Sequence, residues 1–132
     1  MKTILISLFL LTSSLFSSSI KWHGDYTKAL LSAKKQNKNI MLFLQERDCI
    51  DCKKMLQSTL YNQDYIKKIN DSYISIIVQR ENQISYPIEL FYTLTYPTVF
   101  FINTEDESFL INPIYGYVTP QKFKKYFFTI DK

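Results

Sequence analysis

Two patterns of apolar residues predict the secondary structure of this chain beyond its first twenty residues. Apolar residues at helical spacing alternate with short, continuous apolar runs, which are typical of strands buried on both faces. Helices are expected at residues 25–36, 49–60, 65–69, 88–93 and 119–130. Strands are expected at residues 40–44, 73–78, 98–102 and 109–111. The last helix has the clearest signal, because Thr119 and Pro120 suit its start and an apolar stripe follows them.

The order of these elements predicts an α/β fold of three layers, α/β/α, around a central mixed four-stranded sheet. A strand–helix–strand unit comes first and is joined to a pair of strands. The segment between residues 98–102 and 109–111 is polar, acidic and turn-like, so these two strands are expected to form an antiparallel hairpin. Helices that flank the strands along the chain then cover both faces of the sheet.

The first 19 residues have the pattern of a secretory signal peptide. Lys2 precedes an apolar stretch from Ile4 to Leu11, and a serine-rich segment follows as far as Ser19. We therefore expect a signal peptide at 1–19 and one domain at 20–132, located outside the inner membrane and most simply in a bacterial periplasm. The apolar stretch is shorter than the ~20 residues of a membrane span. An uncleaved anchor stays open as an alternative, because serine stands where alanine is usual at the cleavage site.

Composition narrows the function of the expected domain. Lysine and arginine number 16 against 12 acidic residues, so the formal net charge is only +4. The lysines occur as scattered pairs on the polar sides of the predicted helices, where solvated helix faces explain them without a nucleic-acid partner. No later apolar stretch is long enough to span a membrane, so the domain is expected not to cross one.

The chain has two cysteines, and they form a Cys-x-x-Cys motif. Cys49 and Cys52 follow the apolar run 40–44 and open a helical pattern, which places both thiols where a buried strand turns into a helix. Unpaired N–H groups and the helix dipole at such a position favour a thiolate. Residues three apart on a helix lie close enough for a disulfide to open and close with little backbone movement. The motif therefore indicates a redox site.

Two structural readings of the motif stay open beside the redox one. As a purely structural disulfide, the pair would add little to the free energy of unfolding, because the loop that it closes is very short. A zinc site usually needs four Cys or His ligands, and the chain offers two cysteines and His23 as its single histidine. We therefore expect no metal.

Four motifs together resemble the thioredoxin superfamily, in particular its small exported members. They are the segment Lys38–Leu44, Cys49–Cys52 followed by Lys53-Lys54-Met55, Tyr96-Pro97-Thr98, and Gly116–Pro120. The resemblance extends from Trp22 to about Phe128 and implies a thioredoxin-like fold. It also implies thiol–disulfide exchange with no cofactor beyond a Cys49–Cys52 disulfide.

The resemblance implies a role for each motif residue. Cys49 would attack a substrate disulfide, and Cys52 would resolve the mixed disulfide. Pro97 would be a cis-proline facing the cysteines, between Thr98 and a Tyr96 whose backbone pairs with a bound peptide. The alternative is a trans proline that merely begins an edge strand. The nearby aromatic residues Phe91, Tyr92 and Tyr96 are expected either to line a substrate groove or to pack in the core.

Several residues depart from the usual family pattern and bear on the direction of electron flow. Asp48 precedes the motif, Ile50 and Asp51 stand inside it, and Phe43 replaces a buried acid that relays a proton in thioredoxins. The two aspartates disfavour a thiolate at Cys49, which predicts a reducing couple.

The expected activity is therefore that of a reductase acting on exported proteins with disulfides. Its electrons would come from a membrane thiol reductase, and apocytochrome c is one expected client. Three alternatives stay open: a dithiol oxidase working in the opposite direction, a non-catalytic binding module of the same fold, and a copper chaperone. The copper reading fits least well, because such proteins resemble Cys-x-x-x-Cys with a distant histidine.

Overall fold

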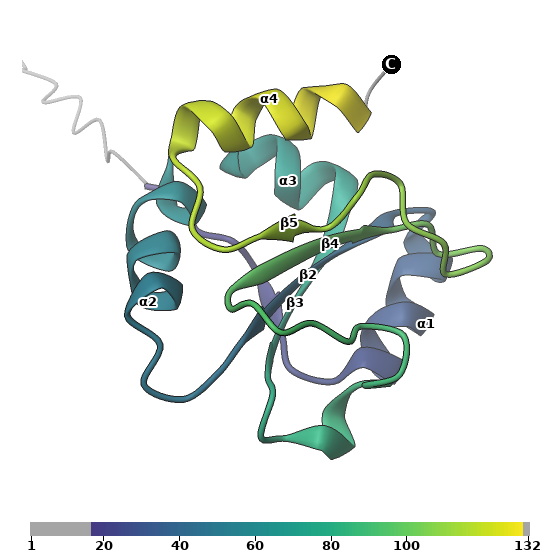
Figure 1. Cartoon of the computed structure of the whole chain (residues 1–132). Helices are drawn as coiled ribbons and strands as arrows, with labels where there is room; N and C mark the ends of the chain where they lie inside the picture. The colour runs from purple at the N-terminus through teal and green to yellow at the C-terminus, as the bar shows by residue number, and fades with distance from the viewer. Residues whose placement is uncertain (1–16, 131–132) are drawn as a thin grey trace, which may run out of the picture.

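The protein, a computed structural model that describes residues 17–130, is built on one mixed sheet with strand order β1-β3-β2-β4-β5 (Figure 1). The strands are β1 (Trp22–His23), β2 (Asn39–Gln45), β3 (Tyr73–Gln79), β4 (Thr98–Ile102) and β5 (Ile114–Tyr115). The α-helices are α1 (Tyr26–Gln36), α2 (Ile50–Gln57), α3 (Ile66–Ser72) and α4 (Pro120–Ile130). Two 3₁₀ turns, η1 (Thr59–Tyr61) and η2 (Gln83–Ser85), complete the described elements.

The register of the sheet brings three chain segments to one end of it. Strand β2 runs parallel to β3, with Leu44 opposite Val78, and antiparallel to β4, with Leu44 opposite Thr98. The last residues of β2 and β3 therefore lie beside the first residue of β4. The segments that follow Gln45 and Gln79, and the segment that precedes Thr98, meet at this end, where open α/β sheets usually place their sites.

Alternation along β2 divides the core into two halves. Met41 and Phe43 pack with residues of α2, α3 and α4, whereas Ile40 and Leu42 pack on the other face with residues of α1. Both faces of β2 are buried, which explains its continuous apolar sequence. In Figure 1, α3 and α4 lie on one side of the sheet and α1 on the other, so the predicted three layers are confirmed.

The predicted helices are confirmed in four of five places. Asp25 caps α1, where its carboxylate accepts a hydrogen bond from the Lys28 backbone N–H at 2.9 Å. The prediction of a helix at 88–93 was wrong, because these residues form turns. Phe91 is buried there against Tyr26 and Phe100. The Thr93 hydroxyl accepts a hydrogen bond from the Thr95 N–H, which competes with helical bonding.

The expected four-stranded sheet has five strands. The short strand β1 pairs with β3 and was not expected, since two residues carry no periodic signal. The hairpin partner of β4 was also misplaced: β5 at 114–115 pairs with β4, whereas Phe109 makes only an isolated bridge to Ile102. Residues 1–16 of the predicted signal peptide lie outside the described residues, so the signal peptide stays a prediction.

Candidate functional site

A disulfide joins Cys49 and Cys52 at the start of α2. The S–S distance is 2.09 Å and the two Cα atoms are 5.2 Å apart. Cys49 is the N-cap of the helix, with an extended backbone, and its Sγ accepts a hydrogen bond from the Cys52 N–H at 3.1 Å. A sulfur at this position receives one of the unpaired N–H groups of the first helical turn. The same N–H is placed to stabilise a thiolate when the disulfide is reduced.

The two sulfur-bearing residues differ in accessibility. Cys52 is 1% exposed and belongs to the core beneath α2, while Cys49 is only half-buried. Ile50 is 81% exposed at the start of α2, and Asp48 and Asp51 are exposed on either side of Cys49. An incoming sulfur can therefore reach the disulfide through Cys49, across a surface that is apolar at Ile50 and acidic at the two aspartates.

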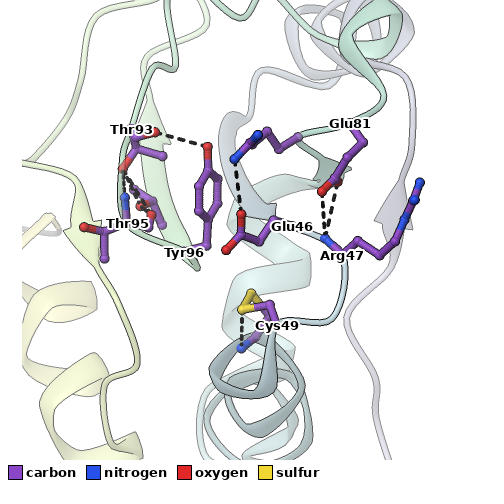
Figure 2. Close-up of polar contacts among 10 residues, drawn as sticks. Glu46, Arg47, Cys49, Glu81, Thr93, Thr95 and Tyr96 are labelled. Atoms are coloured by element: carbon purple, nitrogen blue, oxygen red, sulfur yellow. Dashed lines mark hydrogen bonds and ion pairs between the residues drawn. A yellow bond between two sulfur atoms is a disulfide. The ribbon is translucent and has the colours of Figure 1, made fainter.

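The loop that leads to Cys49 is fastened to the segment after β3 (Figure 2). The Arg47 backbone N–H donates to both carboxylate oxygens of Glu81, at 3.0 and 3.3 Å. The side chain of Arg80 pairs with Glu46 at 3.3 Å, and its backbone N–H donates to the Gln45 carbonyl at 2.7 Å. The hydrogen bond from Arg47 lowers the pKa of Glu81. These contacts fix the strand-to-helix turn, in which Asp48 takes a left-handed conformation with φ 56°.

A second loop, at residues 93–97, approaches the same end of the sheet. The Tyr96–Pro97 peptide bond is cis, and Pro97 is buried. The Pro97 carbonyl accepts a hydrogen bond from the Gly116 N–H at 2.7 Å, which ties the loop to the chain after β5. Because Thr98 pairs with Leu44, this loop lies beside the turn that carries Cys49.

Threonine hydroxyl groups stabilise this second loop from within. Thr98 is fully buried, and its hydroxyl donates to the Thr95 carbonyl at 2.6 Å. The Thr93 and Thr98 hydroxyls lie 3.1 Å apart, and the Tyr96 hydroxyl donates to the Thr93 carbonyl at 3.1 Å. The polar atoms behind Pro97 are therefore paired with one another, which holds the loop in one conformation.

The structure thus brings together the residues that the sequence singled out. Cys49 and Cys52 are bonded, Asp48, Ile50 and Asp51 surround them, and Tyr96, Pro97 and Thr98 form the neighbouring loop. The aromatic residues divide between the two expectations: Phe91 is buried in the core, whereas Tyr92 is 70% exposed and Tyr96 half-buried.

Sequence reasoning did not find the contacts made by Arg80 and Glu81. A signal for them exists in the chain, since Glu46-Arg47 follows β2 and Arg80-Glu81 follows the parallel neighbour β3. Because β2 and β3 are parallel neighbours, Glu46 lies opposite Arg80 and Arg47 lies opposite Glu81. Each acidic residue is therefore near a basic residue of the adjacent strand end. The hydroxyl of Thr93 was also missed, because a single threonine carries no such pattern.

Within residues 17–130, no three or more His, Cys, Asp or Glu side chains are grouped in a way that would hold a metal ion. No helix in this part of the chain combines the length and the apolar character needed to cross a membrane.

The chain belongs to the thioredoxin-like family, whose family model matches residues 21–104. This match includes the disulfide, the loop before β4 and all of β1 to β4. No sequence among the curated proteins matches the chain. The assignment to the thioredoxin superfamily, made above from four motifs, is confirmed.

Solved structures of similar fold support the same architecture. A thioredoxin from Thermus thermophilus is similar with a TM-score of 0.69 and 16% identity, covering 86% of this chain and 88% of that one. A DsbH oxidoreductase gives 0.66 and 18%, covering 92% and 91%. The oxidised C-terminal domain of Neisseria meningitidis DsbD gives 0.61 and 20%, covering 78% and 90%. A Cys-x-x-Cys disulfide inside a thioredoxin-like domain supports thiol–disulfide oxidoreductase activity.

Proposed function

We propose that this protein is an exported reductase of protein disulfides that works through the Cys49–Cys52 dithiol. The observation that carries the proposal is the unequal burial of two bonded sulfurs in one helical turn: Cys49 is reachable and Cys52 is 1% exposed. A half-buried sulfur suits the attack on another protein. A buried sulfur within bonding distance suits release of the product.

The reaction follows from this geometry and balances in electrons and protons. In the reduced protein, the Cys49 thiolate attacks one sulfur of a client disulfide. The client S–S bond breaks, a mixed disulfide forms at Cys49, and the first client thiolate leaves and takes up a proton. The Cys52 thiolate then attacks the Cys49 sulfur and releases the second client thiol, so two electrons pass to the client. The product is the disulfide seen in this structure, and a reduced protein dithiol must restore the starting state.

The charges around Cys49 support a reducing couple. Asp48 and Asp51 flank it on the exposed surface, and negative charge disfavours the thiolate that a strong oxidant stabilises. The test is the reduction potential, measured by equilibration with glutathione or dithiothreitol buffers. A value well below −200 mV is expected, while a value above about −150 mV, close to that of a strong oxidant, would reverse the assignment to a dithiol oxidase.

The location and partners belong to the same proposal. The signal-peptide pattern of residues 1–19 supports export, and in an oxidising compartment a reductase needs a steady source of electrons. A membrane thiol reductase is the proposed donor. Exported proteins with unwanted disulfides, such as apocytochrome c, are the proposed clients.

A trapping experiment tests the partners and the activity together. Cys52→Ala, expressed in the native envelope, is expected to accumulate mixed disulfides at Cys49 with client proteins and with the donor. Cys49→Ala is the matched control, since it keeps one thiol but loses the accessible one. If neither variant traps a protein and the wild-type protein does not accelerate insulin reduction by dithiothreitol, the domain is a non-catalytic binding module instead.

A further inference from the structure

A cavity of about 360 Å³ lies at the end of the sheet that carries the disulfide, between the residues at the end of β2 and the loop that precedes Pro97. Its deep part is apolar and is formed by the buried residues Leu44, Tyr86 and Phe91. Tyr92 and Tyr96 stand on its walls. Neither cysteine nor Pro97 lines the cavity.

Two residues of the cavity connect it to the reaction site. Glu46 lies three residues before Cys49 on the fastened loop, and Tyr96 directly precedes Pro97. In Figure 2 the Glu46 carboxylate and the Tyr96 ring stand near each other above the disulfide. An extended peptide that brings its cysteine to Cys49 and passes along Tyr96 advances about 3.3 Å per residue, with alternate side chains on the same side. A side chain close in sequence to the client cysteine, on the side of the strand that faces Glu46 and Tyr96, can therefore enter the cavity.

The charges at the mouth favour an uncharged occupant. Arg80 and Glu46 both line the cavity and pair with each other at 3.3 Å, with side-chain exposures of 52% and 36%. A charged client side chain would compete with one member of this pair for the other, whereas a neutral one would not. The guanidinium carbon of Arg80 lies 5.9 Å from the centre of the Tyr96 ring, so the cation already faces an aromatic wall.

Shape and chemistry then select an aromatic side chain. The volume accommodates one large side chain, and the Tyr92 and Tyr96 rings line the cavity. Leu94, which also lines the cavity, is 83% exposed and Tyr92 is 70% exposed. When an aromatic ring enters the cavity, both side chains would bury apolar surface that is otherwise exposed to water, which favours binding.

We propose that this cavity is a specificity subsite that binds a phenylalanine or tyrosine side chain of the client, close in sequence to the client cysteine. The inference rests on the proposed function, because it concerns the polypeptide that reacts at Cys49. It names the client class more closely than the disulfide does: an extended segment with an aromatic residue near its cysteine, and no charge at that position.

The test uses short synthetic peptides that carry a mixed disulfide at one cysteine, with phenylalanine, alanine or glutamate two positions before or after it. The full domain, reduced beforehand, is mixed with each peptide, and the second-order rate constant for disulfide reduction is measured. The phenylalanine peptide is expected to react at least about tenfold faster than the alanine peptide in one of the two placements. The glutamate peptide is expected to react no faster than the alanine one.

Two variants separate the cavity from general surface effects. Tyr92→Ala removes a wall and is expected to reduce the ratio of the phenylalanine rate to the alanine rate to within about threefold. Ile84→Ala is the matched control, because Ile84 is 99% exposed on the same segment and does not line this cavity. It is expected to keep the full preference.

The outcomes distinguish the two proposals. If the wild-type domain reduces none of the peptides and no small disulfide such as glutathione disulfide, the proposed function fails. If it reduces phenylalanine, alanine and glutamate peptides at equal rates in both placements, the reductase stands and the subsite is refuted. A preference that survives Tyr92→Ala unchanged also refutes the subsite.

Discussion

Reduction of the Cys49–Cys52 disulfide is expected to lower the free energy of unfolding by about 2 kcal/mol. The bond joins residues with a sequence separation of 3. For so short a closed loop, the chain-entropy relation gives about 6 cal/mol/K of lost entropy in the unfolded chain, or about 2 kcal/mol at 25 °C. For a domain of this size, that corresponds to a fall of about 6–12 °C in Tm.

The same energy appears in the redox equilibrium. By thermodynamic linkage, the disulfide and the folded state stabilise each other by the same free energy. A stabilisation of about 2 kcal/mol therefore makes the reduction potential of the folded protein about 40 mV lower than that of the unfolded chain. One contact works against this: the Cys52 N–H lies 3.1 Å from the Cys49 sulfur and stabilises a thiolate there. The calculated value is therefore an upper limit for the effect.

Thermal unfolding followed by circular dichroism, with and without a phosphine reductant, measures the difference. The double variant Cys49→Ser/Cys52→Ser is the control, since its Tm must not respond to the reductant. A reduced protein that is as stable as the oxidised one, or more stable, would refute the reasoning. It would show that thiolate stabilisation outweighs the loop entropy, as it does in a dithiol oxidase.

Three further predictions concern the core, the tyrosines and the thiols. Met55→Ala, at a fully buried position on α2, is expected to lower the free energy of unfolding in urea by about 2–5 kcal/mol. Met55→Leu is expected to lower it by less than about 1.5 kcal/mol, and equal effects of the two variants would contradict the packing described. Burial raises the pKa of Tyr26 and of Tyr65, and the unfolded chain ionises both near pH 10, so stability is kept below pH 10 and falls as the pH rises above it. A Tm that is unchanged between pH 8 and pH 10.5 would oppose this. After reduction, iodoacetamide is expected to modify Cys49 at least about tenfold faster than Cys52, as mass spectrometry of timed samples will show; equal rates would mean that the buried thiol is reachable.

Much of the fold could be predicted because its signals are local and strong. The runs 40–44 and 73–78 are apolar on both faces, and the stripe after Thr119 has helical spacing, so each indicates its element without tertiary information. The helix expected at 88–93 failed for a tertiary reason. Packing of Phe91 on Tyr26 and Phe100 decides the conformation there, and neither partner is near in the sequence.

The candidate site likewise has one part that could be predicted from the sequence and one part that could not. The Cys49–Cys52 pair and the Tyr96-Pro97-Thr98 segment stand out in the sequence because their spacing and order are unusual. The hydrogen bond that the Arg47 N–H donates to Glu81 depends on the register between β2 and β3, which no local pattern contains. Part of the lining of the cavity beside Tyr96 likewise comes from residues 88–93, which form turns where a helix was expected.

The burial of Cys52 has a consequence for damage by peroxides. A thiol is converted to sulfenic, and then irreversibly to sulfinic acid, according to its thiolate character and its access to oxidant. Because Cys52 is buried on the core side of α2, that chemistry is expected at Cys49. A sulfenic acid formed there has a resolving thiol three residues away, and condensation with it returns the disulfide before a second oxidation occurs.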